Sequence, residues 1–284
     1  MSRVAERNAP IVAGDIDWAA RWRSTVEARH AADATVTAVG RDRWDGRAAR
    51  FAHLTRSLDA ATDPFVLALR RAVRPTDSVL DVGAGAGRYA LAIAPDVGRV
   101  TAVEPSPGMR AAFEEEARAR GVQNVRLVPG TWDEAVVEPH DVAFVANVLY
   151  FVPDAVSFID KLDRSATRVC FILHRVEEMG SVLGPVWDEI GSRRAPEAGF
   201  LELYNLLFSL GIRPDVELVR SALGGRYDGI DDAIAEARQY LGIAASDTSH
   251  DARIRESLAE SLVTVDGRLG FARRPQLAII SWEK

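Results

Sequence analysis

The chain has 284 residues, of which 48% are hydrophobic and 27% are charged, so it can bury the core of one large domain, with or without additions. Its net charge of −6 and pI near 5.5 disfavour a nucleic-acid ligand, because binding a polyphosphate backbone depends on excess lysine and arginine. No apolar run reaches the roughly 18 residues of a membrane span. Met1 to Asp17 lack the apolar segment of a signal peptide, so we expect a cytoplasmic protein. The single cysteine, Cys170, excludes a cysteine-based zinc or iron–sulfur site, and we predict no metal.

The first 75 residues have a helical pattern. Trp18, Trp22 and Val26 recur at helical spacing. Asp63 followed by Pro64 predicts the start of another helix, since proline is favoured in the first turn. We therefore expect residues 1–75 to form a helical region before the first strand.

The next segment predicts a strand, a tight turn and a helix in immediate succession. Val79 to Val82 is an apolar run that contains Asp81, and three alternating glycines follow it, at positions Gly83, Gly85 and Gly87. Glycines at such a turn allow positive φ and let a ligand approach the main-chain N–H groups. A dinucleotide-binding turn has the spacing G-x-G-x-x-G, whereas here Arg88 occupies the third position. The turn therefore favours a nucleoside cofactor but argues against a nicotinamide-dependent dehydrogenase.

Each of the next predicted strands has polar or aromatic residues at its carboxyl end. A β-rich run from Arg99 ends in Glu104, 23 residues after Asp81, where an acid can accept both hydroxyl hydrogens of a ribose; an ordinary solvated acid is the alternative. Three more strands are predicted at residues 124–128, 141–146 and 168–173. The residues that follow these strands are Thr131, Trp132 and Asp133, then Asn147 and Tyr150, then His174.

The blocks between residues 79 and 174 resemble, in order and spacing, the motifs of the class I S-adenosylmethionine-dependent methyltransferases. The resemblance implies an α/β fold, a Rossmann-like doubly wound sheet of seven strands with the last strand antiparallel, and S-adenosylmethionine as cofactor. It implies that Glu104 binds the ribose, that Met109 lies against the adenine and that Asn147 lies near the methionine portion. The family more often has aspartate at the position of Thr131, which leaves Asp133 as an alternative contact to the adenine amine. The expected cofactor-binding residues are Asp81, Gly83, Gly85, Gly87, Arg88, Glu104, Pro105, Met109, Thr131, Trp132 and Asn147.

The remaining segments are expected to complete the sheet and cover the site. Val216 to Val219 predicts the sixth strand and Gln276 to Trp282 the last one. We expect a methyltransferase domain over residues 76–284, with insertions at about 176–214 and 223–274 that form a substrate cover. Family members often close leading helices over the cofactor, which implies that residues 1–75 form a lid. Within it Trp44, Arg47 and Phe51 would contact the ligands, although Trp44 and Phe51 could instead dock the helix on the core.

The expected chemistry requires little from the protein. A sulfonium methyl donor is already activated, so positioning for in-line displacement and exclusion of water can supply most of the acceleration. A general base is needed only if the acceptor atom is protonated at neutral pH. His174 and Tyr150 lie at the edge of the sheet where α/β proteins bind ligands, and they are the catalytic candidates; structural hydrogen bonds are the alternative role.

Three functions remain in competition. The leading prediction is methyl transfer to a small-molecule acceptor at oxygen, nitrogen or carbon, without a membrane or nucleic-acid partner and with a homodimer left open. The second is a methyltransferase that acts on tRNA or protein through the arginines near the N-terminus. The third is a protein that binds S-adenosylmethionine without catalysis.

Overall fold

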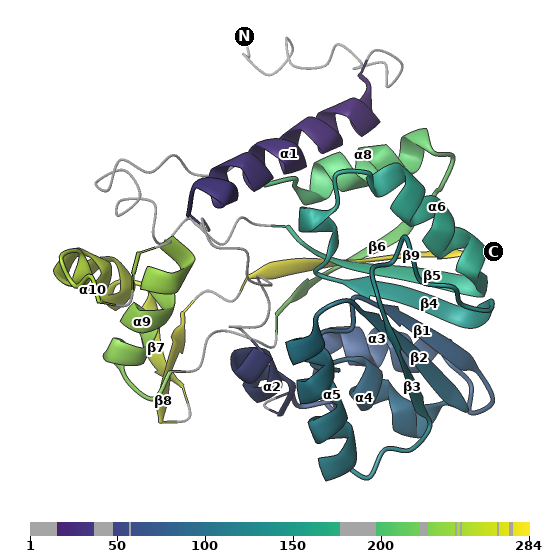
Figure 1. Ribbon diagram of the computed structural model, residues 1–284, viewed down its shortest axis with the longest axis horizontal. Helices are drawn as coiled ribbons and strands as arrows, with labels where there is room; N and C mark the ends of the chain where they lie inside the picture. The colour runs from purple at the N-terminus through teal and green to yellow at the C-terminus, as the bar shows by residue number, and fades with distance from the viewer. Residues whose placement is uncertain are drawn as a thin grey trace, which may run out of the picture.

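The computed structural model describes residues 16–36, 48–56, 58–176, 197–221, 227–241, 243–244, 246–265, 267–272 and 275–284. The main feature of these residues is a seven-stranded sheet in the order β3-β2-β1-β4-β5-β9-β6 (Figure 1). The strands are β1 (Ser78–Val82), β2 (Arg99–Glu104), β3 (Val125–Pro129), β4 (His140–Ala146), β5 (Ala166–Arg175), β6 (Asp215–Arg220) and β9 (Gln276–Glu283). The first five are parallel, and β9 lies antiparallel between β5 and β6. The predicted doubly wound sheet with an antiparallel last strand is confirmed.

Helices cover both faces of this sheet. One face is covered by α1 (Trp18–Val36), α6 (Ala155–Ser165) and α8 (Phe200–Ser209), and the other by α3 (Pro64–Ala72), α4 (Ala90–Ile93) and α5 (Pro107–Ala119) (Figure 1). Side chains alternate along each strand, so Leu80 and Val82 face the first set of helices while Val79 faces the second. Short 3-10 turns, η3 (Ala94–Asp96) and η4 (Leu149–Phe151), follow α4 and β4.

The N-terminal helices belong to different parts of the fold. Trp22 of α1 is fully buried in the core beneath α6 and α8, and its indole N–H donates to the carbonyl oxygen of Val152 at 2.9 Å. Asp63 begins α3 as the sequence predicts, because its carboxylate accepts the N–H groups of Phe65 and Val66. The helix α2 (Ala48–Arg56) packs beside the glycine turn, where Ala52 belongs to the same apolar cluster as Ala86.

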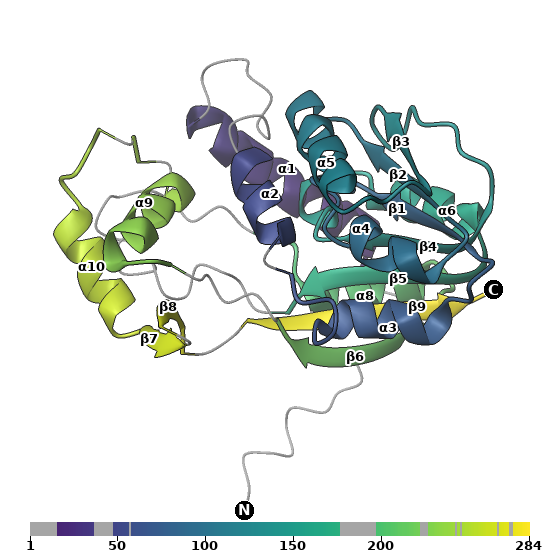
Figure 2. The ribbon, with the colours of Figure 1, turned by 90° about the horizontal axis from the view of Figure 1, so that it is seen from below.

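A second unit, which we call the insertion unit, lies between β6 and β9. It comprises α9 (Ile230–Leu241), α10 (Asp251–Ala259), β7 (Leu262–Val265) and β8 (Arg268–Phe271), and it has its own apolar core around Ile234 and Ile254. Gly267, between β7 and β8, has φ 78°. Figures 1 and 2 both show the unit beside the carboxyl ends of the parallel strands. No helix in the described part of the chain is long and apolar enough to cross a membrane.

Candidate cofactor and acceptor site

At two positions of the glycine turn after β1, the neighbouring side chains leave no room for any residue larger than glycine. Gly83, Gly85 and Gly87 have φ values of 73°, 56° and 84°, in the left-handed region that favours glycine. A Cβ at position 83 would lie 2.5 Å from a methyl group of Val148, and one at position 87 would lie 2.7 Å from the ring of Phe113. These two glycines therefore let the turn pack closely against neighbouring side chains of the protein.

Gly85 differs from its neighbours because a Cβ there would meet no heavy atom of the described residues within 4 Å. Its backbone N–H donates to the carboxylate of Glu104 at 2.8 Å, which connects the turn to the end of β2. The surface above Gly85 is thus open space next to a carboxylate, at the carboxyl edge of the sheet.

Glu104 is buried, with 5% of its surface exposed, and its second carboxylate oxygen accepts the N–H of Ser106 at 2.9 Å. Asp81, on the adjacent strand, is also buried, and burial together with the charge of Glu104 raises the pKa of Asp81 well above its usual value. Two carboxyl groups therefore lie under the turn, and Glu104 is the one that accepts backbone N–H groups from the turn itself and from the loop after β2.

Replacement of Glu104 by alanine should weaken binding of S-adenosylhomocysteine by about 1.5–3 kcal/mol, or roughly tenfold to hundredfold, because a charged hydrogen-bond acceptor is lost. Glu104→Gln, which keeps one acceptor oxygen, should lie between Glu104→Ala and the wild type. Calorimetric titration measures both, with Glu217→Ala, the loss of an exposed acid on β6, as the control. Unchanged affinity in Glu104→Ala would show that this carboxylate only connects the two loops.

The apolar side of the turn is a small cluster formed by Met109, Ala86 and Ala52, all buried, with Phe51 packed against it. Met109 therefore lies beside the turn and under α2, and its contact with adenine stays a prediction. Trp44 and Arg47, the other expected lid residues, lie outside the described residues. Pro105 is exposed on the loop after β2.

Arg88 points away from this cluster. Its guanidinium lies 3.5 Å from the carboxylate of Asp63, the residue that begins α3, and 5.0 Å from the centroid of the Tyr89 ring. The side chain therefore stabilises packing between α3 and the turn. A contact between Arg88 and the cofactor stays a prediction, and it would have to come from the main chain.

The turn after β3 places its two candidate residues differently. Thr131 is exposed and its hydroxyl donates to Glu134 at 2.8 Å. The indole of Trp132 is 5% exposed, lies in the core beneath α6, and donates its N–H to the carbonyl oxygen of Phe158 at 3.2 Å. This burial favours a role for Trp132 as an anchor of the turn over direct stacking on adenine.

At the end of β4, Asn147 has φ 59°, and it is the one non-glycine residue with positive φ in the described part of the chain. Such strained positions cluster at functional sites, because the surrounding structure must hold them. Here Tyr150 donates its hydroxyl hydrogen to the Asn147 side-chain oxygen at 3.3 Å and accepts the backbone N–H of Arg175. The hydroxyl of Tyr150 therefore connects β4 to β5 and holds the Asn147 amide.

His174, one residue before Arg175, is 1% exposed, and its ring centroid lies 4.2 Å from that of Tyr150. Its Nδ1 is 2.8 Å from the carbonyl oxygen of Arg175, so Nδ1 carries the hydrogen and Nε2 is the free lone pair. Nε2 is buried and has no hydrogen-bond partner in the described part of the chain. Burial lowers the pKa of His174 to about 3, so the ring is neutral at physiological pH.

Sequence reasoning missed the charged group beside these residues. The guanidinium of Arg175 lies 4.4 Å from the centroid of the Tyr150 ring and pairs with Glu197, whose carboxylate is also 2.9 Å from Arg29 of α1. Only the position of Arg175 directly after His174 could have signalled this group. Arg29 and Glu197 lie far from β5 in the sequence and are brought to it by the packing of α1.

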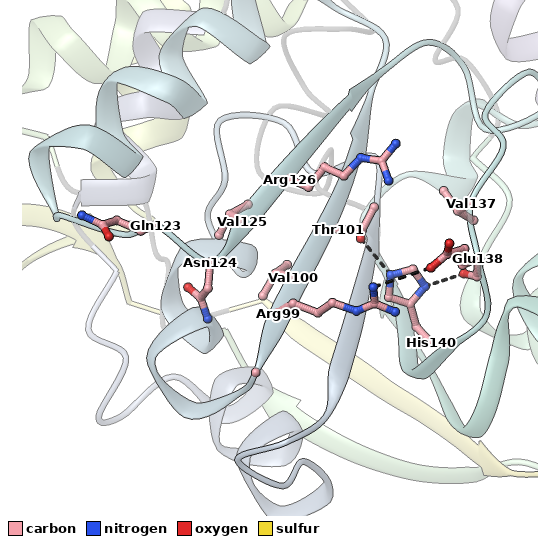
Figure 3. Close-up of a pocket in the computed structure, with 11 residues that line it drawn as sticks. Arg99, Val100, Thr101, Gln123, Asn124, Val125, Arg126, Val137, Glu138 and His140 are labelled. Carbon is pink, nitrogen blue, oxygen red and sulfur yellow. Dashed lines mark hydrogen bonds and ion pairs between the residues drawn. The ribbon is translucent and has the colours of Figure 1, made fainter.

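A cavity of about 260 Å³ lies elsewhere, at the amino ends of β2, β3 and β4 (Figure 3). Its wall includes Arg99, Arg126 and His140, and the His140 ring is 2.8 Å from the hydroxyl of Thr101. Because parallel strands carry the glycine turn at their opposite ends, this cavity is separate from the candidate site.

The described geometry fits the parts of S-adenosylmethionine: open space over Gly85, a buried carboxylate at Glu104, and an apolar surface at Met109. Residues 79–168 match a family model described as a methyltransferase domain. Among solved structures, the YcgJ protein of Bacillus subtilis is similar, with a TM-score of 0.53 and 19% identity over 77% of this chain and 96% of that one.

A proposed methyltransferase, BH2331 from Bacillus halodurans C-125, gives a TM-score of 0.55 and 16% identity over 80% of this chain and 98% of that one. A search of curated proteins finds no match. The two structural similarities show the fold, and the family match covers the segment that holds the glycine turn, Glu104 and Asn147. Residues 79–168 therefore match a methyltransferase domain, in agreement with the resemblance of their motifs to the class I S-adenosylmethionine-dependent methyltransferases.

Proposed function

We propose that this enzyme transfers the methyl group of S-adenosylmethionine to a small-molecule acceptor. The observation that carries the proposal is the place of the insertion unit beside the carboxyl edge of the sheet, where Gly85, Glu104 and Asn147 also lie (Figures 1 and 2). A folded unit next to this edge restricts how large an acceptor can reach the site, and it excludes water from part of it. Both effects favour a small acceptor over a folded macromolecule.

On this proposal the turn at Gly85 receives the methionine portion of the cofactor, Glu104 binds the ribose, and Met109 with the turn at Thr131 holds the adenine. The bound cofactor supplies a methyl group on a positively charged sulfur, which is already activated for transfer to a nucleophile. The chain contributes positioning. Its glycines let the backbone approach the cofactor, Tyr150 donates a hydrogen bond to Asn147, and Glu104 accepts one from the Gly85 N–H.

His174 and Tyr150 act here as positioning groups. With a pKa of about 3, the His174 ring is too weak a base to remove a proton efficiently near neutral pH. Its free Nε2 can accept a hydrogen bond, and the Tyr150 hydroxyl holds the Asn147 amide. We therefore favour an acceptor atom that reacts with its own lone pair or that loses its proton to water.

The proposal is tested with S-adenosylmethionine labelled in its methyl group. The full chain is incubated with a bacterial extract that dialysis has separated into small molecules and macromolecules. We expect label in the small-molecule fraction, and none in either fraction with Gly85→Val. Label confined to protein or RNA would overturn the small-molecule assignment in favour of the macromolecular alternative. Of the docking arginines near the N-terminus that this alternative uses (positions 41, 43, 47, 50 and 56), those at 41, 43 and 47 lie outside the described residues.

A further inference from the structure

Lys161 lies outside the candidate site, but it contacts the turn after β3, which belongs to that site. Lys161 lies on α6, and its ammonium group donates to the carbonyl oxygens of Trp132, of Asp133 at 3.1 Å and of Ala135 at 2.8 Å. These acceptors match the three donors that an ammonium group has. The same nitrogen lies 4.5 Å from the centroid of the Trp132 ring, within the range of a cation–π interaction.

The segment that Lys161 holds is a single helical turn. The N–H of Ala135 donates to the carbonyl oxygen of Thr131 at 2.9 Å, and Thr131 donates through both its N–H and its hydroxyl to the carboxylate of Glu134. One turn of helix is not stable by itself, and its last carbonyl groups lack donors within the turn. Lys161 supplies those donors, and the buried Trp132 indole anchors the turn beneath α6.

This turn is next to the ribose-binding position. Pro129, the last residue of β3, is the register partner of Glu104, the last residue of β2. Thr131 follows two residues later, so a change in the shape of the turn would move Thr131 and Asp133 relative to Glu104.

We propose that Lys161 is a positioning residue for base recognition, which holds Thr131 and Asp133 where they read the adenine of the cofactor. This inference rests on the proposed use of the β3 turn by the cofactor. The composition agrees with a special role, since the chain has 35 lysines and arginines of which only Lys161 and Lys284 are lysine. A compact ammonium group can lie among three carbonyl oxygens, whereas the planar guanidinium of arginine presents its donors in a fixed fork.

The test compares Lys161→Met with Lys284→Met. The control removes the same charge from a lysine that pairs with Asp163, also on α6. Calorimetry measures binding of S-adenosylhomocysteine and of S-inosylhomocysteine, in which a carbonyl oxygen replaces the adenine amine. We expect Lys161→Met to weaken S-adenosylhomocysteine binding about tenfold and to lose most of the preference of the wild type for adenine over hypoxanthine. Lys284→Met should keep both the affinity and the preference.

A second variant covers the case in which Lys161→Met does not fold. Lys161→Arg keeps the charge and the contact with Trp132 but cannot satisfy all three carbonyls, so we expect an intermediate loss of base preference. Base preference unchanged in both Lys161 variants would overturn the inference and leave Lys161 a residue that only stabilises the fold. Wild-type protein that binds neither ligand would instead contradict the proposed function, and wild-type protein that binds both equally would show that the β3 turn does not read the base.

Discussion

Gly85→Val is expected to weaken binding of S-adenosylhomocysteine by about a hundredfold or more, equivalent to about 2.7 kcal/mol, while the protein stays folded. The valine side chain would project into the open space above the turn, where a Cβ lies more than 4 Å from the atoms that the structure describes. The φ of 56° at this position adds a backbone penalty of about 1–2 kcal/mol to folding, which lowers stability without preventing it. Calorimetric titration and thermal unfolding of the same sample separate the two effects.

A matched control comes from another glycine with the same backbone conformation. Gly121, after α5, has φ 66° and likewise no heavy atom within 4 Å of an added Cβ. Gly121→Val should lose similar stability and bind S-adenosylhomocysteine with wild-type affinity. If Gly85→Val also bound with wild-type affinity, the open space over the turn would not be the cofactor site.

The second large expected effect is a loss of folding stability at acidic pH, caused by His174. His174 has a folded pKa of about 3 against an ordinary value near 6.5, because burial disfavours the charged ring. The unfolded chain therefore binds a proton on His174 at pH values where the native chain does not, and stability falls as the pH drops from about 6.5 toward 3. This one group should lower the free energy of unfolding by about 2 kcal/mol at pH 5 relative to pH 8.

His174→Phe removes this titration and keeps an aromatic ring beside Tyr150. When the pH is lowered from 8 to 5, the free energy of unfolding of the wild type should fall by about 2 kcal/mol more than that of the variant, whatever the stability of the variant at pH 8. His140, whose pKa burial also lowers, is present in both proteins and cancels in the comparison. Urea unfolding at the two pH values gives the difference, and His174→Asn, which keeps a donor for the Arg175 carbonyl, should behave alike. Parallel pH dependence in all three proteins would show that His174 titrates normally in the native state.

The strands, the glycine turn and Glu104 could be predicted because their signals are local. An apolar run followed by alternating glycines specifies a strand and a turn with positive φ, and Gly83, Gly85 and Gly87 have it. Parallel strands end at one edge, so an acid at the end of β2 had to lie near the turn after β1, and Glu104 accepts the Gly85 N–H.

Side-chain directions could not be predicted, since packing between distant segments decides them. Trp132 lies in the core because Phe158 and Lys161 of α6 lie over it, and no feature near Trp132 in the sequence indicates those partners. Arg88 pairs with Asp63, 25 residues earlier. Asparagine is one of the residues that favour positive φ, but the neighbours that hold Asn147 there, Leu173 and Tyr150, lie on other segments.

The way in which the insertion unit joins the sheet has a consequence for how this enzyme can diverge. Arg220, the last residue of β6, and Gln276, the first residue of β9, are register partners, and the N–H of Ser221 donates to the carbonyl oxygen of Pro275 at 2.9 Å. The chain thus leaves and re-enters the sheet at adjacent points, a distance that a short hairpin loop can span. A different unit could replace it there without altering β1, β2 or the glycine turn. If the insertion unit selects the acceptor, as the proposed function requires, acceptor choice can then evolve separately from the methyl donor.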